Sequence, residues 1–132
     1  MKIRTGFVSN SSSSSFVIQG NAFDESSFLD NLKDEKKAEL IELMRSEGYE
    51  NPDPEKAFYD FFEDGELYSA AFFEPLKTIR DWESEIIYVG IHYTSMEMDE
   101  TKRNFIEKVD NAFNEYFKGE IKSRFILAEV WE

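Results

Sequence analysis

Cysteine is absent from this 132-residue chain, and histidine occurs only once. The lack of cysteine excludes disulfide bonds and thiolate metal sites, and it suits a cytoplasmic protein. A single imidazole, that of His92, argues against a histidine-based metal site. No apolar run approaches the ~18 residues of a transmembrane helix, and the first residues contain no apolar signal-peptide core. We therefore expect no metal, no cofactor and no membrane contact.

Basic residues are also scarce, since 15 Lys and Arg stand against 28 Asp and Glu, for a net charge of −13. Residues 21–66 alone hold fifteen of the acids and only five of the bases. A field of this sign disfavours nucleic acid and anionic lipid, whose binding needs Lys and Arg at the phosphates. It favours a protein partner with a basic surface. The alternative is a solvated acidic surface that serves only solubility.

Apolar residues, in contrast, are plentiful: 41% of the chain is hydrophobic and it contains 13 Phe. A chain of this length and composition can build a core, which predicts one folded domain over residues 1–132. We divide it into an N-terminal segment with a serine run, an acidic helical segment and a C-terminal strand–helix–strand unit, at residues 1–20, 21–66 and 86–131.

The C-terminal unit has the clearest pattern. A β-branched and aromatic run over 86–93 predicts a buried strand, in which Gly90 marks a bulge or a close approach by a neighbouring element. A helix is predicted over 99–118, with Asp99 as its N-cap and Gly119 after its end. The last strand follows, and both of its faces are expected to be partly covered. The helix should bury the apolar stripe Phe105, Ile106, Val109, Ala112, Phe113, Tyr116 and Phe117.

The preceding part of the chain is less regular. The serine run, 9–15, lies between two apolar segments, which predicts two short strands joined by a serine loop. A strand is predicted over 67–73, followed by a loop or helical turn over 76–85. Three helices are predicted in the acidic segment. The first, 24–33, buries Phe28, Leu29 and Leu32, and the third, 54–63, buries Ala57, Phe58, Phe61 and Phe62. The second, 35–47, is capped by Asp34 and ends at Gly48, and its apolar face is Ala38, Ile41 and Met44, with Leu40 and Leu43 beside them.

These elements together predict an α+β fold. We expect a small mixed β-sheet of three or four strands, helices packed mainly on one face, and a C-terminal β-α-β unit.

Two stretches of the chain carry a resemblance. RTGFVSNSSSSSFVI resembles the opening of a diverse set of uncharacterised bacteriophage and prophage proteins, with a basic residue, a Gly-Phe-Val-Ser-Asn step and a serine run that ends in Phe. VGIHYTSMEMDETKRNFIEKV is similar to a later segment of some of those proteins, and the two stretches cover about a quarter of the chain. The resemblance implies a phage protein and transfers no catalytic residue. The matching residues of the second stretch are Gly90, Met96, Asp99, Glu100, Thr101 and Phe105.

Groups that could support catalysis are few. A lone strand histidine such as His92 is usually structural. A Ser-His-Asp site could combine it with a serine of the run and with Asp99 or Glu100, but no nucleophile-elbow motif is present. The acids Glu97, Asp99 and Glu100 lack the spacing of a calcium loop. We therefore predict no catalytic, cofactor-binding or metal-binding residue.

The resemblance and the acidic balance together predict a non-catalytic phage protein that acts through protein–protein contacts. In the first hypothesis it works in the host cytoplasm and modulates a host protein with a basic surface. The alternative is a structural or virion-associated component, and a small enzyme is the third reading. The residues predicted to contact the partner are Glu39, Glu42, Glu47, Asp60, Glu63 and Asp64.

Overall fold

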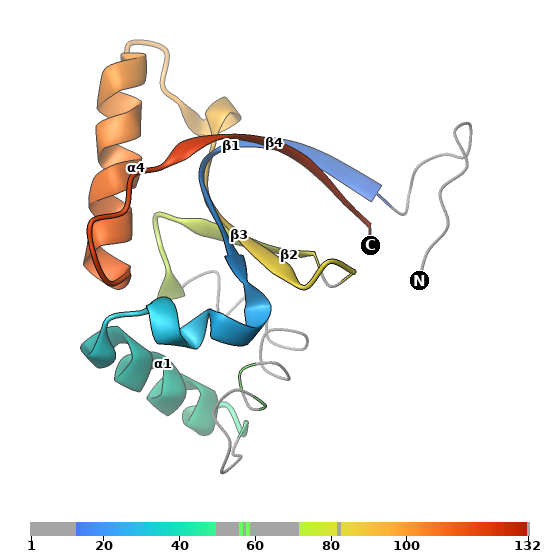
Figure 1. Ribbon diagram of the computed structural model, residues 1–132. Coiled ribbons are helices and arrows are strands. Elements are labelled where there is room, and N and C mark those ends of the chain that lie inside the picture. Colours follow the sequence, from blue (N-terminus) through green and yellow to red (C-terminus); the bar gives the residue numbers. More distant parts are fainter. Residues whose placement is uncertain (1–12, 50–55, 57, 59–71, 82, 132) are drawn as a thin grey trace.

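The computed structural model describes residues 13–49, 56, 58, 72–81 and 83–131 (Figure 1). Within them the chain folds as a four-stranded sheet with two α-helices and three short 3-10 turns, which confirms the predicted α+β class. The elements in chain order are β1 (Ser13–Asp24), η1 (Glu25–Ser27), η2 (Leu29–Asn31), α1 (Asp34–Ser46), β2 (Lys77–Asp81), β3 (Ile86–His92), η3 (Tyr93–Ser95), α4 (Lys102–Tyr116) and β4 (Arg124–Trp131).

The sheet has the strand order β2-β3-β1-β4, and every neighbouring pair is antiparallel. The expectation of a mixed sheet is therefore wrong. β3 and β4 do run in the same direction, but β1 lies between them and pairs with both. The pattern of residues 86–131 indicates a strand, a helix and a strand, and it carries no information about a third strand inserted between the two.

β1 and β3 approach each other very closely where Gly20 lies directly opposite Gly90. A Cβ atom on Gly20 would lie 2.0 Å from the carbonyl oxygen of Val89, and one on Gly90 would lie 2.4 Å from that of Gln19. Since no side chain fits in this space, both positions require glycine. The predicted role of Gly90 as a point of close approach is confirmed.

The sheet is strongly curved, and its two sides bury separate apolar clusters. Figure 1 shows α1 and α4 on the convex side, as expected of helices packed mainly on one face. The concave side encloses a smaller cluster of Phe16, Ile18 and Ile126, with Ile79 and Tyr88 packed against it. The edge strands β2 and β4 approach each other as a result. The larger cluster, on the convex side, includes Phe28, Leu32, Leu40, Met44, Phe73, Ile87, Val89, Phe105, Val109, Phe113 and Phe117.

Helix α4 and Phe117, which follows its last residue, bury the predicted stripe except Ile106, which is half-buried. Phe105, Val109, Phe113 and Phe117 have no exposed surface, and Ala112 and Tyr116 retain only 7%. The helix begins three residues later than predicted, because the side chain of Thr101, not Asp99, accepts the capping hydrogen bond, from the amide of Asn104 at 3.1 Å. Gly119 has the expected left-handed backbone, with φ of 76°.

The segment predicted as a helix over 24–33 instead consists of the last residue of β1 and the turns η1 and η2. Phe28, Leu29 and Leu32 are nevertheless buried, as predicted. The apolar residues therefore determine burial here, while the stretch is too short and too polar to sustain an α-helix between two tightly packed elements.

Helix α1 begins at Asp34, which lies in the first turn; Lys33 occupies the cap position and makes no side-chain capping bond. The buried residues are Leu40 and Met44, while Ala38 is exposed. The buried face is centred on Leu40 and Met44, with Ile41 and Leu43 packed beside them. Ala38 lies on roughly the opposite side of the helix, so its predicted place on the inward face is wrong. Gly48 ends the helix with φ of 93°, as predicted.

The strand predicted over 67–73 is wrong where it can be checked, because Phe72 is helical and Phe73 lies in a turn. The strand forms instead as β2, inside the segment predicted as a loop. Its sequence, KTIRD, lacks the apolar pattern of a strand, because the inward-facing residue Arg80 is charged. The charge is tolerated there because Arg80 is paired with an acid. Residues 67–71 lie outside the described part, as does most of the predicted helix 54–63, including Phe61 and Phe62; Phe58, which is described, is helical and buried.

The last three residues of the serine run, 13–15, belong to β1 and not to a loop. Residues 13–15 pair with 129–131 of β4, so this part of the run is an element of the sheet. Residues 1–12, with the first predicted strand, lie outside the described part of the chain.

The buried position of Phe113 gives a first prediction. Its ring packs against those of Phe23 and Phe117, at centroid distances of 6.3 and 5.4 Å. The substitution Phe113→Ala should lower the free energy of unfolding by about 3–5 kcal/mol, a large share of the ~5–15 kcal/mol typical of a domain. Chemical denaturation measures this loss. Met98→Ala, at a side chain that is fully exposed, is the control and should change stability by less than about 0.5 kcal/mol.

The glycine pair gives a second prediction. Gly20→Ala places a methyl group against backbone, which cannot move aside as a side chain can, so the loss should reach or exceed the ~3 kcal/mol upper end for overpacking. Gly119→Ala is the matched control, because its Cβ would meet nothing within 4 Å and only its left-handed backbone is strained, at about 1–2 kcal/mol. Equal losses for the two variants in thermal or chemical unfolding would show that the close approach is not rigid.

Candidate functional site

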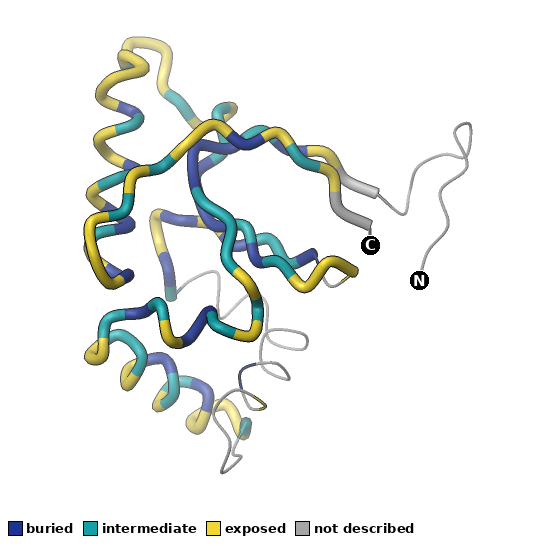
Figure 2. Tube along the Cα trace, viewed as in Figure 1, coloured by how far each residue is buried: buried dark blue, intermediate teal, exposed yellow. Residues whose placement is uncertain are grey.

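Three of the six predicted contact residues are described by the structure, and all three are exposed. Glu39 and Glu42 lie on α1, and Glu47 follows its last residue. Figure 2 shows the exposed turns of α1 on the side that faces away from the sheet. The other three predicted residues, Asp60, Glu63 and Asp64, lie outside the described part of the chain.

The outer face of α1 is less acidic than the sequence suggested. Glu39 forms an ion pair with Lys36 at 3.4 Å, and Glu42 forms one with Arg45 at 2.5 Å. Over its whole length α1 holds four acids and three bases. Most of the acidic excess of the segment therefore lies further along, in residues 50–66, which contain seven acids and one base.

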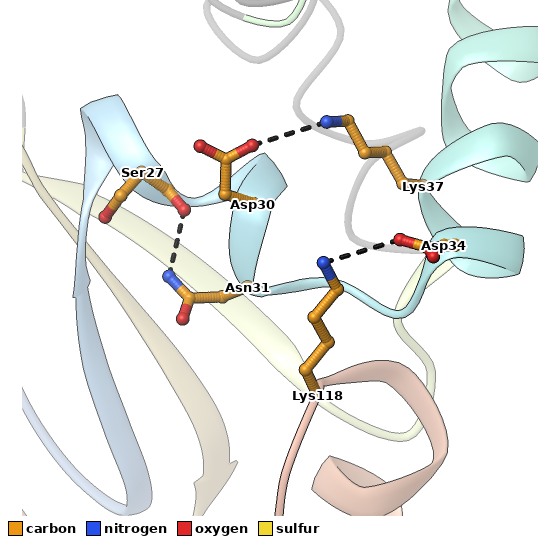
Figure 3. A network of polar contacts seen from close by, with 6 residues as sticks. All are labelled: Ser27, Asp30, Asn31, Asp34, Lys37 and Lys118. Carbon is orange, nitrogen blue, oxygen red and sulfur yellow. Dashed lines mark hydrogen bonds and ion pairs between the residues drawn. The ribbon is translucent and has the colours of Figure 1, made fainter.

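Two more acids of this segment hold α1 in place (Figure 3). Asp30 pairs with Lys37 at 3.3 Å, and Asp34 pairs with Lys118 at 3.4 Å. The backbone amide of Lys118 also donates to the carbonyl of Asn31 at 2.8 Å. These contacts join the start of α1 and the turn η2 to the segment after α4. Because the pairs are largely exposed, they orient the helix more than they stabilise it.

The single histidine, His92, lies on the same face of β3 as Tyr88. The imidazole of His92 meets the ring of Phe16 edge-on, at a centroid distance of 6.5 Å. Phe16 in turn packs against Tyr88 at 5.2 Å. This aromatic environment on the concave side of the sheet indicates a packing role for the imidazole.

The acids that follow η3 organise a turn. The carboxylate of Glu100 accepts a hydrogen bond from the amide of Glu97 at 3.1 Å and pairs with Lys108 at 3.1 Å. The backbone hydrogen bond, followed by Lys108, lowers the pKa of Glu100 below its usual value. Among the residues that the structure describes, no three His, Asp or Glu side chains are grouped so as to hold a metal ion.

A partly buried chain of polar side chains, which the sequence did not reveal, links four parts of the fold. The hydroxyl of Tyr93 donates to the side-chain oxygen of Gln19, whose amide nitrogen donates to the hydroxyl of Ser123 at 2.9 Å. That hydroxyl donates to the carboxylate of Asp110, which also accepts from the backbone amide of Ser123 at 2.7 Å. The chain therefore connects η3, β1, the residue just before β4 and α4.

This chain is built to position elements rather than to activate a nucleophile. Gln19 is only 3% exposed, and both ends of its side-chain amide are satisfied. Burial raises the pKa of Tyr93 above its usual value, so the phenol stays protonated and remains a donor. Ser123 contacts a carboxylate directly, with no imidazole between them, whereas nucleophilic serines rely on an adjacent general base. The sequence contains one signal for this chain: Gln19, which has an amide side chain, lies among the apolar residues of β1.

A second contact, between two largely buried side chains, ties β2 to the turn η1, which follows β1. Arg80 and Glu25 form a two-pronged ion pair, with distances of 2.9 Å from Nη2 to Oε1 and 3.1 Å from Nε to Oε2. Their side chains are only 10% and 8% exposed. A planar guanidinium matches a carboxylate in this geometry. The pair accounts for the inward-facing charge that concealed β2 in the sequence.

The largest exposed apolar side chains of the described residues are Phe125, Leu127 and Met98. Phe125 and Leu127 are 60% and 68% exposed and lie on one face of β4, whereas Ile126 on the other face is 8% exposed. The expectation that both faces of the last strand are partly covered is therefore wrong. β4 is an edge strand, and on this face the ring of Tyr93 packs against Phe125, at 5.6 Å.

No protein-family model, curated protein or solved structure matches this chain. No helix in the described residues is long and apolar enough to cross a membrane.

The partly buried polar chain gives a third prediction. Gln19→Leu should cost about 1–3 kcal/mol of stability, because it removes one partner each from the partly buried groups of Tyr93 and Ser123. Adding Tyr93→Phe removes the orphaned hydroxyl, so the double variant should lose less than the sum of the two single variants. A double-mutant cycle by chemical denaturation measures this coupling. Strictly additive losses would show that the two side chains act independently.

Proposed function

We propose that this chain is a non-catalytic bacteriophage protein that acts through contacts with another protein. The charge distribution carries the proposal: an acidic chain presents Glu39, Glu42 and Glu47 to solvent, and its acidic excess continues through residues 50–66. The chemistry that complements this surface is a protein with a basic face, such as a nucleic-acid-binding groove of a host protein. The phage assignment rests on the resemblance of the N-terminal serine run and the Gly90–Phe105 segment.

The described polar clusters also favour a binding role over catalysis. Gln19 has structural partners within its four-residue chain, and Arg80 has one in its ion pair. Among the described residues, the hydroxyl of Thr78 is the buried side-chain group that has no hydrogen-bond partner. The exposed acids, in contrast, are held only by short-range pairs on α1 that a basic partner can replace at little cost. Long-range attraction between opposite charges would speed the encounter and make the complex sensitive to salt.

A charge-reversal variant tests the acidic surface. Glu39→Lys, Glu42→Lys and Glu47→Lys together should weaken binding to a basic partner captured from host lysate by roughly tenfold or more, which corresponds to ~1.4 kcal/mol or more. Stability should change little, since exposed charges contribute little to folding. A salt titration of the wild-type complex should show affinity that falls as salt rises.

The matched control reverses three exposed acids elsewhere, Glu97→Lys, Glu107→Lys and Glu120→Lys, which changes the net charge equally. Equal weakening by both triple variants would indicate a general effect of net charge. Affinity that ignores salt and the α1 reversals would contradict the proposed surface.

A structural or virion-associated role is the second candidate, favoured by the edge strand β4 with its exposed apolar residues. Mass spectrometry of purified virions separates the two. Under the first proposal the chain is absent from virions and is recovered with a host protein, whereas stoichiometric presence in virions would support the alternative.

A further inference from the structure

The exposed apolar surface on β4 is a candidate site for binding another chain. Phe125 and Leu127 are more than half exposed on an edge strand, and exposed apolar edge strands are sites at which another chain can pair. β2 approaches β4 from the concave side, where Ile79 and Ile126 share a cluster. The two exposed side chains lie on the opposite, convex side and remain accessible.

The order of residues on this face of β4 is self-complementary. On this face the strand carries Phe125, Leu127 and Glu129, preceded by Ser123, the residue just before β4: polar, apolar, apolar and polar. Within the chain, Ser123 is bound to Gln19 and Asp110, and Glu129 accepts a hydrogen bond from Ser15. In an antiparallel pairing centred on Ile126, Phe125 of each copy lies opposite Leu127 of the other. Directly opposed apolar residues are the pairs that stabilise antiparallel strands. The polar ends then meet each other at the margins.

The charges of the strand favour the same arrangement. The exposed base Arg124 is its first residue, with the exposed base Lys122 two residues before it, and the exposed acid Glu129 lies near its end. Antiparallel pairing brings the basic end of one strand near the acidic end of the other, whereas parallel pairing in register would place Arg124 beside Arg124 and Glu129 beside Glu129. In the antiparallel register Arg124 and Glu129 lie on different faces of the sheet, so the attraction acts between the strand ends and not between directly opposed side chains. β4 itself contains one base and one acid, so two copies of an acidic chain meet here with little local repulsion.

We propose that β4 is the interface of a two-fold homodimer, in which the β4 strands of two copies pair antiparallel about Ile126 and join two four-stranded sheets. Such an interface is isologous, with the same patch contributed by both copies. This proposal does not depend on the acidic surface of α1, which lies on the other side of the molecule in Figure 1.

Light scattering during size-exclusion chromatography tests the dimer. The wild-type chain should move toward twice the mass of one copy as its concentration rises, and more so at higher salt, because salt screens the repulsion between two chains of charge −13. Leu127→Glu should restore the mass of one copy with its circular dichroism unchanged. Met98→Glu is the control: it places the same charge on a fully exposed apolar residue outside β4, and it should leave the dimer intact.

Cross-linking tests the register, and the absence of cysteine makes it unambiguous. Directly opposed residues have Cα atoms about 4.5–5.5 Å apart, within the reach of a disulfide. A mixture of the Phe125→Cys and Leu127→Cys proteins should therefore cross-link under mild oxidation, at least severalfold more than either protein alone. Like residues would be diagonal neighbours at ~7–8 Å, at or beyond the limit for a disulfide.

A wild-type chain that keeps the mass of one copy at every concentration and salt would overturn the proposal. So would a dimer that persists in Leu127→Glu, because its interface would then lie elsewhere. A dimer abolished by Leu127→Glu, with cross-links strongest between like residues, would contradict the register centred on Ile126.

Discussion

The close contact between Gly20 and Gly90 is the constraint on which the rest of the sheet depends. It lies between the two central strands, β1 and β3, and leaves room for no side chain on either of them. A sheet with no side chains at its centre can curve strongly there. The curvature encloses Phe16, Ile18 and Ile126 on one side and brings the edge strands β2 and β4 toward each other. The other side is left broad enough for the two helices.

The curvature also decides which surfaces stay open. Helix α4 packs against β1, and the polar chain through Gln19 and Ser123 fixes α4 to the residue just before β4. Beyond that point β4 continues past the helix, so Phe125 and Leu127 remain exposed although they lie on the same side as the main core. The exposed apolar patch is therefore a consequence of how the sheet bends and where the helix is anchored.

The sequence predicted features that depend on local order. The stripe of α4, the burial of Phe28 and Leu32, the close approach at Gly90 and the left-handed Gly48 and Gly119 all follow from spacing or from a single residue type. The predictions failed where the structure depends on contacts between residues that are far apart in the sequence. β2 contains the charged residue Arg80, which is tolerated at an inward position because it pairs with Glu25. The position of β1 between β3 and β4 cannot be predicted from the periodicity of apolar residues, because that periodicity does not depend on strand order. The exposure of Phe125 likewise depends on strand order, and the contact acids could be predicted only as exposed.

The two proposed interfaces draw on opposite parts of one charge distribution. Acids are dense along residues 34–66, where a chain of like charge is repelled and a basic protein is attracted. They are sparse along β4, where one base and one acid remain and apolar side chains are exposed. Repulsion between the acidic parts therefore restricts self-association to the strand that carries the least charge, and the same repulsion keeps the acidic surfaces of two paired copies apart. A dimer formed through β4 would leave both acidic surfaces accessible, so each copy could bind a basic partner independently.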